Sequence, residues 1–387
     1  MAQTKVNTEH DMIRKSVKSL CERFPETYWQ ETDERGEYPT SFVQALTDEG
    51  WLSVLIPEQY GGAGLGMTEA SIVLEEINRS GGNAGACHAQ MYTMGAILRH
   101  GSEEQKQRFL PKIASGEARL QAFGITEPTA GSDTTSIETF AHKEGDKYIV
   151  NGQKIWTSRA EHSDLMLLLA RTTPKEAVAK KTDGLSLFIL DMKEQHDKIT
   201  IRPIDTMINH ATTEVFFENA EIPVENLIGE EGKGFKYVLS GMNAERILIA
   251  SESVGDGLYF IDRSVQYANE RVVFNRPIGK NQGVQFPIAK AFMEIEAAKL
   301  MRDRAADLFD EGVNCGAEAN MAKYLTSEAT WNAANAAMDT YGGYGFAKEY
   351  NIERKFREAR LFKVAPIANN LVLSFVGQHV LGLPRSY

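Results

Sequence analysis

Cysteine is scarce in this sequence, and its scarcity narrows the kinds of site that the chain can build. The 387 residues contain three cysteines, Cys21, Cys87 and Cys315, which lie far apart and form no Cys-x-x-Cys pair. Neither a zinc cluster nor a disulfide framework is expected. We predict that each cysteine is a small buried apolar side chain in a protein of a reducing compartment. The histidines are scattered as well, so no metal site is predicted.

Long apolar runs and an excess of positive charge are also lacking. No stretch reaches the roughly 18 apolar residues that a membrane-spanning helix needs, and residues 1–20 contain no apolar core of signal-peptide length. The formal net charge is −11, whereas broad contact with a nucleic-acid backbone requires a basic face. We therefore expect a cytoplasmic protein that spans no membrane and binds no nucleic acid.

Helical patterns occupy the two ends of the chain. Apolar residues recur on one helix face at 41–50 and 68–78, so residues 1–119 are predicted to form an N-terminal helical domain. Patterns that are long enough for several turns lie at 245–264, 286–310 and 317–340. They predict a C-terminal helical domain over residues 231–387.

Short apolar runs bounded by turn residues dominate the region between them, residues 120–230. These runs lie at 148–150, 165–170, 185–190 and 214–217, and they are typical of strands. Asn151-Gly152 is a strong signal for a two-residue turn, so a hairpin is expected between 147–150 and 153–157. The middle region is predicted to be a β-barrel or β-sandwich, which makes the fold class α+β with three domains.

A glycine-rich segment at 61–66 invites comparison with the dinucleotide fingerprint G-x-G-x-x-G. An apolar run at 51–56 precedes it and a helical pattern follows. The spacing fails, because a fingerprint that starts at Gly62 and Gly64 would need its third glycine where Met67 stands. We predict a structural loop here and not a nicotinamide site.

Two polar blocks carry far more specific information. Residues 122–133 form a glycine-containing loop after an apolar strand, with hydroxyls and free backbone N–H groups able to face a ligand, and Asn151-Gly152-Gln153-Lys154-Ile155-Trp156 follows soon after. The loop resembles the first signature of the acyl-CoA dehydrogenases, and the second block resembles the one that follows it. Further similar blocks lie at 222–235, 269–282 and 341–345, so the resemblance extends from about residue 10 to 383.

The resemblance implies a fold, a cofactor and an assembly. The fold would have an N-terminal helical domain, a central β-domain and a C-terminal four-helix bundle, and the protein would be a homotetramer that binds FAD and an acyl-CoA. The flavin ring would be lined by Phe123, Ile125 and Thr126, with Trp156 packed against it and Ser158 near N5. Ser132 would lie near the pyrophosphate or the substrate. The adenosine diphosphate half would be held, from the neighbouring subunit, by Arg271, Phe274, Gln282 and Gly343.

The catalytic base is where this sequence departs from much of the family. The usual loop glutamate corresponds to Pro366. Long-chain and isovaleryl-type members carry the base on a helix before an arginine, and Glu245-Arg246 is similar to that version. The resemblance thus implies Glu245 as the base and Arg246 as a residue that organises the site or the CoA. The alternative is that both are charges on a helix surface.

Pro366 also removes a backbone donor, because proline has no N–H. In the family the N–H at this position helps to bind the thioester oxygen. Three explanations remain open: Ile367 or an asparagine supplies the donor, the thioester lies differently, or the reaction is not the standard one.

Three functions follow from these observations. The first is FAD-dependent dehydrogenation of an acyl-CoA to a trans-2-enoyl-CoA in fatty acid metabolism, with electrons passed to an electron-transfer flavoprotein. The second is a flavin monooxygenase or oxidase on the same fold, and the third is a non-catalytic flavin-binding subunit of a hetero-oligomer, since one fold hosts several functions.

Overall fold

The computed structural model describes residues 8–385, which group into two compact units. The helical unit contains residues 8–35, Gly66–Ala84 and 243–385, and the sheet unit contains Gly36–Leu65 and Gly85–Met242. Helix α7 contributes to both units, because it begins at Gly234 and ends at Glu270. No helix of the described residues is long and apolar enough to cross a membrane.

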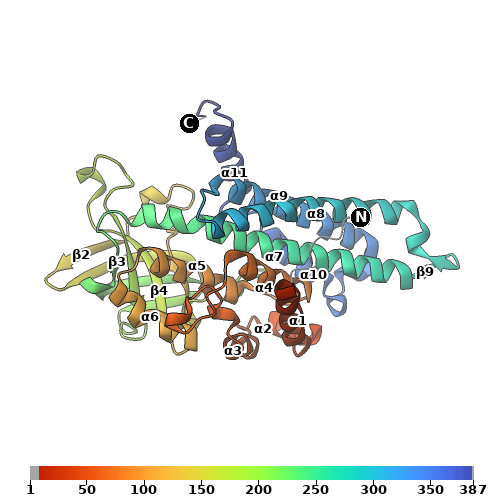
Figure 1. Cartoon of the computed structure of the whole chain (residues 1–387), viewed down its shortest axis with the longest axis horizontal. Helices are drawn as coiled ribbons and strands as arrows, with labels where there is room; N and C mark the ends of the chain where they lie inside the picture. The colour runs from red at the N-terminus through yellow and green to blue at the C-terminus, as the bar shows by residue number, and fades with distance from the viewer. Residues whose placement is uncertain (1–7, 386–387) are drawn as a thin grey trace. The chain divides into compact units, whose positions relative to one another are not determined.

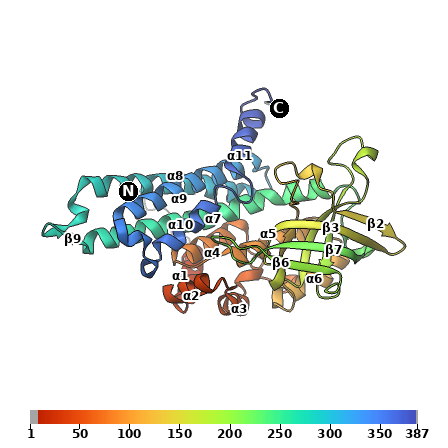
Figure 2. The ribbon, with the colours of Figure 1, turned by 180° about the vertical axis from the view of Figure 1, so that it is seen from behind.

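The helical unit is built around the long helices α7, α8 and α9, with α10 beside them (Figure 1). Figure 2 shows the same helices side by side from behind. A short hairpin connects α7 to α8, and α11 follows α10. The elements are α1 (Thr8–Glu22), α2 (Glu26–Arg35), α4 (Met67–Arg79), α7 (Gly234–Glu270), β9 (Val272–Val273), β10 (Arg276–Pro277), α8 (Gln282–Asp310), α9 (Gly316–Tyr341), α10 (Ile352–Leu361) and α11 (Asn369–Phe375).

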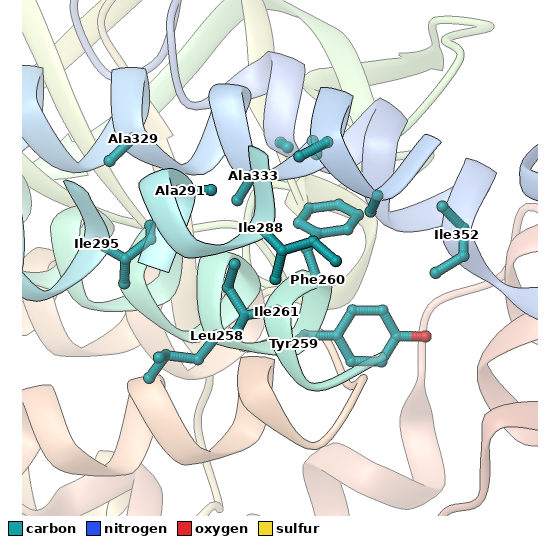
Figure 3. Packing of buried hydrophobic residues seen from close by; sticks show 14 of the residues in the cluster. Leu258, Tyr259, Phe260, Ile261, Ile288, Ala291, Ile295, Ala329, Ala333 and Ile352 are labelled. Atoms are coloured by element: carbon teal, nitrogen blue, oxygen red, sulfur yellow. The ribbon is translucent and has the colours of Figure 1, made fainter. Parts of the chain in front are cut away.

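One apolar core joins the four helices α7 to α10. In Figure 3, Phe260 of α7 and Ile288 of α8 lie beneath Ala333 of α9, with Ile352 of α10 alongside. The buried face of α9 is rich in alanine, the best helix former, which also brings no bulk to the helix contact. The predicted helical segments 245–264, 286–310 and 317–340 are therefore confirmed, and so is the C-terminal helical bundle.

The sheet unit pairs eight strands in the order β6-β7-β3-β2-β4-β5-β8, with β1 parallel to β4. Strand β4 is buried along its whole length between its neighbours, which accounts for its apolar run at 165–170. The central β-domain is confirmed. Its elements are α3 (Thr40–Asp48), α5 (Gly85–His100), α6 (Glu103–Ser115), β1 (Leu120–Gly124), β2 (Phe140–Glu144), β3 (Lys147–Ser158), β4 (Leu165–Arg171), β5 (Leu185–Asp191), β6 (Ile199–Pro203), β7 (Thr212–Pro223) and β8 (Leu227–Ile228).

The hairpin predicted at Asn151-Gly152 is wrong. Strand β3 runs through both residues, and the real turn is Gly145-Asp146, because Glu144 of β2 pairs with Lys147. Gly152 instead accompanies a register shift between β3 and β7. Its φ is 147°, and an added Cβ would lie 2.7 Å from the Thr139 Cα. Close backbone approach at a bulge, and not chain reversal, requires the glycine.

The predictions for the cysteines and for the glycine-rich segment are confirmed. All three cysteines are buried, as predicted. The glycine-rich segment after the 3-10 turn Trp51–Ser53 is a loop, as expected. An added Cβ at Gly62 would lie 2.1 Å from the Ile56 carbonyl oxygen, so close packing accounts for that glycine.

Candidate functional site

The loop that follows β1 is held against β3. Phe123 lies near the end of β1, and Ile125 and Thr126 come directly after the strand; all three are partly buried. The Ile155 N–H donates to the Thr126 carbonyl oxygen at 2.9 Å. This hydrogen bond places the loop beside the end of β3, which carries two more of the predicted residues.

Trp156 and Ser158 stand at that end of β3. The register against β7 shifts between Lys154 and Thr157, and Trp156 there has a φ of 59° and remains 58% exposed. A large exposed indole is unusual on a strand and is available to a ligand. The Ser158 hydroxyl accepts a hydrogen bond from the Asn209 side-chain amide at 2.8 Å.

A buried ion pair that the sequence analysis missed lies under this loop. Lys154 is completely buried, and its ammonium donates to the Ile125 carbonyl oxygen at 2.9 Å and to the Glu127 carboxylate at 2.8 Å. Glu127 also accepts the backbone N–H groups of Glu138 and Thr139, at 2.6 and 2.9 Å. The sequence did single out the Asn151–Trp156 block, which contains this lysine. It did not show that the lysine pairs with Glu127.

Each member of this pair favours the charged form of the other. Burial lowers the pKa of Lys154 to about 8, and the negative charge of Glu127 limits the decrease. Burial works against the Glu127 carboxylate, but the Lys154 charge and the backbone donors hold its pKa below the usual value. The loop therefore carries a buried ion pair whose ammonium group lies directly behind the Ile125 carbonyl group.

Ser132 lies on the exposed part of the same loop. Its neighbour Asp133 accepts hydrogen bonds from Thr135 and Ser136, at 2.6 and 2.5 Å, and these bonds fold the loop on itself. No hydrogen bond among residues 8–385 involves the Ser132 side chain. Its predicted contact with a pyrophosphate or a substrate stays a prediction.

The four residues predicted for the adenosine half lie in the helical unit, at the end of the bundle that carries the β9–β10 hairpin. All are exposed, and Phe274 is 95% exposed. The Arg271 guanidinium lies 5.3 Å from the ring centroid of Tyr344, which brings the hairpin to the 3-10 turn Gly342–Phe346. The bundle thus gathers Arg271 and Gly343 near each other, with Gln282 at the start of α8.

Glu245 and Arg246 lie on α7 in the helical unit. Glu245 is only 7% exposed, so the alternative of a solvent-facing helix charge does not hold for it. The Arg246 guanidinium donates to the Asn243 side chain at 3.1 Å. Burial lowers the pKa of Arg246, and the Glu245 charge opposes that change. A carboxylate held in a largely dry environment beside a cation is a suitable general base.

The segment around Pro366 is fixed by a buried lysine, Lys323 of α9. Its ammonium donates to the Ile367 carbonyl oxygen at 2.7 Å and to the Asn369 side chain at 2.6 Å. Burial, with a smaller contribution from the charge of Arg246, lowers the pKa of Lys323 to about 8, and the negative charge of Glu328 limits the decrease. The Asn369 amide donates to Ser327 and Glu328. By contrast, the Ile367 N–H donates no hydrogen bond within residues 8–385.

The residues of the sheet unit fit the flavin ring that the resemblance implies. Neither the N–H nor the hydroxyl of Thr126 has a hydrogen-bond partner in the described part of the chain. Next to this donor edge, Trp156 offers an exposed aromatic face. A planar heterocycle with acceptor atoms along one edge can accept hydrogen bonds from these donors and pack against the ring. No group of three or more metal-ligating side chains was found among residues 8–385.

Comparison with protein families gives three consecutive matches. The model of the acyl-CoA dehydrogenase N-terminal domain matches residues 7–117, the middle-domain model matches 122–220, and the C-terminal-domain model matches 232–380. Together they cover most of the chain.

Comparison with individual proteins supports the same family. An acyl-CoA dehydrogenase of Bacillus subtilis is 34% identical over 380 residues, which cover 97% of this chain and 99% of the relative. The solved butyryl-CoA dehydrogenase of Megasphaera elsdenii superposes with a TM-score of 0.91 at 28% identity, over 98% of this chain and 100% of the other. A structure described as an electron transferring flavoprotein of Acidaminococcus fermentans superposes with a TM-score of 0.92 at 31% identity, over 98% and 100% of the two chains.

Proposed function

Because the chain belongs to the acyl-CoA dehydrogenase family, an FAD-dependent family of oxidoreductases, we propose that it converts an acyl-CoA thioester to the trans-2-enoyl-CoA. The observation that carries this proposal is the buried carboxylate of Glu245 beside Arg246. FAD, when bound, supplies the two-electron acceptor for the hydrogen that leaves the β-carbon. The protein's task is to position the thioester and to remove the α-proton.

Glu245 is the proposed base. A carboxylate that removes an α-proton must be fixed in place and shielded from water, and the burial of Glu245 on α7 provides both conditions. Arg246 organises the same stretch of helix through Asn243. Its charge also acts on Lys323, which holds the segment after Pro366.

The Ile367 N–H is the proposed donor to the thioester oxygen. Pro366 has no N–H, and the Asn369 amide is occupied by Ser327 and Glu328. The Ile367 N–H has no partner in the described residues, and Lys323 fixes the Ile367 carbonyl group. One such donor typically contributes about 3 kcal/mol to transition-state stabilisation, so a replacement for the missing N–H matters.

The cofactor contacts are proposed as well. Phe123, Ile125, Thr126, Trp156 and Ser158 would surround the flavin ring, and Ser132 would lie near the pyrophosphate or the substrate. The exposed set Arg271, Phe274, Gln282 and Gly343 would bind the adenosine half of FAD in a neighbouring subunit. Its exposure supports this assignment, and it makes the homotetramer part of the proposal.

Three further assignments belong with this function. Electrons would pass to an electron-transfer flavoprotein; the likeness to a structure described as an electron transferring flavoprotein supports this partner. The protein would act in the cytoplasm. We also propose domain boundaries at 1–119, 120–230 and 231–387.

An anaerobic titration tests the reaction. The purified FAD-loaded protein is mixed with a series of acyl-CoAs while the absorbance of oxidised flavin is followed, in parallel with a Glu245→Gln variant. We expect one class of acyl-CoA to bleach the wild-type flavin and the variant to remain oxidised. Glu296→Gln, which removes an exposed carboxylate of the same bundle, serves as the control and should bleach normally.

Other outcomes point elsewhere. Bleaching of the Glu245→Gln variant at the wild-type rate would rule out Glu245 as the base. A flavin that no acyl-CoA reduces would contradict dehydrogenation by this chain alone. Oxygen consumption without an added acceptor would then favour the oxidase or monooxygenase, which the Pro366 substitution motivates. Activity only after a second chain is added would favour a partner subunit.

A further inference from the structure

The peptide group between Ile125 and Thr126 has a positive charge on one side and an open donor on the other. Its carbonyl oxygen accepts a hydrogen bond from the Lys154 ammonium at 2.9 Å. The same peptide group carries the Thr126 N–H, which has no partner within residues 8–385. Because this peptide is trans, its C=O and N–H point in opposite directions. Lys154 therefore lies behind the peptide, and the N–H points away from it.

A charged donor on the carbonyl changes what the N–H can do. Hydrogen bonds to ionised groups are roughly twice as strong as neutral ones, and linked hydrogen bonds polarise one another, most of all where the dielectric constant is low. Lys154 is fully buried, so water does not weaken its hydrogen bond to the carbonyl oxygen, although Glu127 offsets part of its charge. The Thr126 N–H is accordingly a stronger donor than an ordinary backbone amide.

Two sets of hydrogen bonds fix the orientation of this peptide. The Thr126 carbonyl oxygen accepts the Ile155 N–H at 2.9 Å. Glu127 holds Lys154 in place, and its carboxylate also accepts the backbone N–H groups of Glu138 and Thr139. A buried Lys would be costly without this carboxylate. The sheet unit thus keeps a buried ion pair, which is costly to desolvate, behind one particular peptide. Apolar side chains in its place could not donate a hydrogen bond to the carbonyl oxygen.

We propose that Lys154 is a positioning residue that acts through the Ile125–Thr126 peptide to favour the two-electron reduced state of the bound flavin. Reduction adds negative charge to the ring, so a strengthened donor at its edge stabilises the reduced state more than the oxidised one. The inference rests on the proposed location of the flavin ring at Thr126. It does not depend on the acyl-CoA, on Glu245 or on the electron acceptor.

The test is the midpoint potential of the purified holoenzyme, measured by chemical reduction against a reference dye. In a Lys154→Met variant we expect the affinity for reduced relative to oxidised flavin to fall about tenfold, which lowers the potential of a two-electron couple by about 30 mV. The matched control is Lys147→Met. It removes a lysine from the same strand whose ion pair with Glu221, at 2.7 Å, is exposed, and its potential should equal that of the wild type.

A second variant covers the case in which Lys154→Met does not fold because Glu127 is left as a buried unpaired charge. The double variant Lys154→Met/Glu127→Gln leaves no such charge and should still lose potential, though less than the single variant. If either Lys154 variant folds, binds FAD and keeps the wild-type potential, then the pair only braces the loop and the proposal is wrong.

Trp156→Ala separates this result from an error in the location of the flavin. Weaker FAD binding in that variant supports the ring site, so an unchanged potential in the Lys154 variants would then overturn the role of Lys154 alone. Unchanged FAD binding in Trp156→Ala would instead overturn the ring site, and with it the basis of this inference. Because no acyl-CoA is added, both outcomes are independent of the dehydrogenation test.

Discussion

At the scale of single residues, the candidate site combines groups that a ligand can reach with buried groups that hold them. Trp156 and Thr126 are of the first kind, and Lys154 and Lys323 are of the second. The two buried lysines have similar contacts, since each donates to one backbone carbonyl oxygen and one side-chain oxygen. Substitution of either lysine should first change the position of the backbone segment that it holds, and only through that change the reaction.

Trp156→Ala gives the clearest prediction at this scale. The indole is 58% exposed, so its removal should leave the melting temperature nearly unchanged. Loss of an aromatic stacking partner is worth about 0.5–1.5 kcal/mol beyond buried area, so the dissociation constant of FAD should rise about tenfold. FAD titration of the apoprotein by fluorescence quenching measures this. Leu239→Ala, an exposed apolar residue of the same unit, is the control; equal losses in both variants would contradict a specific role for Trp156.

At the scale of elements, a buried carboxylate joins three helices of the helical unit. Glu75 of α4 accepts hydrogen bonds from Arg302 and Lys299 of α8, at 2.5 and 2.7 Å, and from Arg14 of α1, at 2.9 Å. Its side chain is fully buried, and that of Arg302 is 1% exposed. Buried ion pairs of this kind contribute little net free energy, but breaking one is costly because a charge is left behind.

Arg302→Met should therefore destabilise the protein strongly, by about 3 kcal/mol, because it leaves part of the Glu75 charge unpaired in the interior. Urea unfolding followed by circular dichroism gives the free energy. The matched control is Lys299→Met, which removes a more exposed partner of the same carboxylate. Its loss should be clearly smaller; a larger loss for Lys299 than for Arg302 would show that burial does not determine the cost.

The same cluster predicts how stability changes with pH. Burial opposes ionisation of Glu75, but Arg302, Lys299 and Arg14 outweigh it and hold the Glu75 pKa well below its ordinary value of 4.5. Below pH 4.5 the unfolded chain takes up this proton before the folded one does, so the contribution is fully present above that pH and is lost as the pH falls. Unfolding free energies at pH 7 and pH 4 should show this loss, and it should be smaller in Arg302→Met. An equal acid sensitivity in both proteins would remove Glu75 as its cause.

At the scale of the whole molecule, the proposed cofactor site would combine residues of two neighbouring chains. The residues proposed for the adenosine half are exposed at one end of the bundle, where an exposed aromatic such as Phe274 favours an intermolecular contact. A monomer would leave these residues without a function. The proposed homotetramer provides one.

Mixing two inactive variants tests this arrangement. Glu245→Gln lacks the proposed base and Arg271→Ala lacks an adenosine contact, so each alone should have little activity. If neighbouring subunits share a site, co-expressed hybrids should recover part of the wild-type activity, because some sites then combine an intact Glu245 with an intact Arg271. Recovery no greater than that of the two variants assayed separately would indicate that each chain holds its own FAD.

The sequence by itself determined the helices of the bundle, the strand-rich middle and the family. Periodicity and turn residues are local properties, so segments such as 286–310 could be placed without any structure. Locality is also why the hairpin at Asn151-Gly152 was wrong: the turn signal was present, but pairing with β2 and β7 on both sides keeps β3 continuous through it.

Only the tertiary structure decided which polar groups are buried and what they contact. Lys154 donates a hydrogen bond to Glu127, 27 residues away in the sequence, and Lys323 donates one to Ile367, 44 residues away. Glu245 is buried although its neighbours in sequence include charged and polar residues. Such partners depend on how distant segments pack, and an ionised group can be buried only where packing supplies its counter-charge and hydrogen-bond donors. The residues next to it in the sequence do not show which distant residues will supply them.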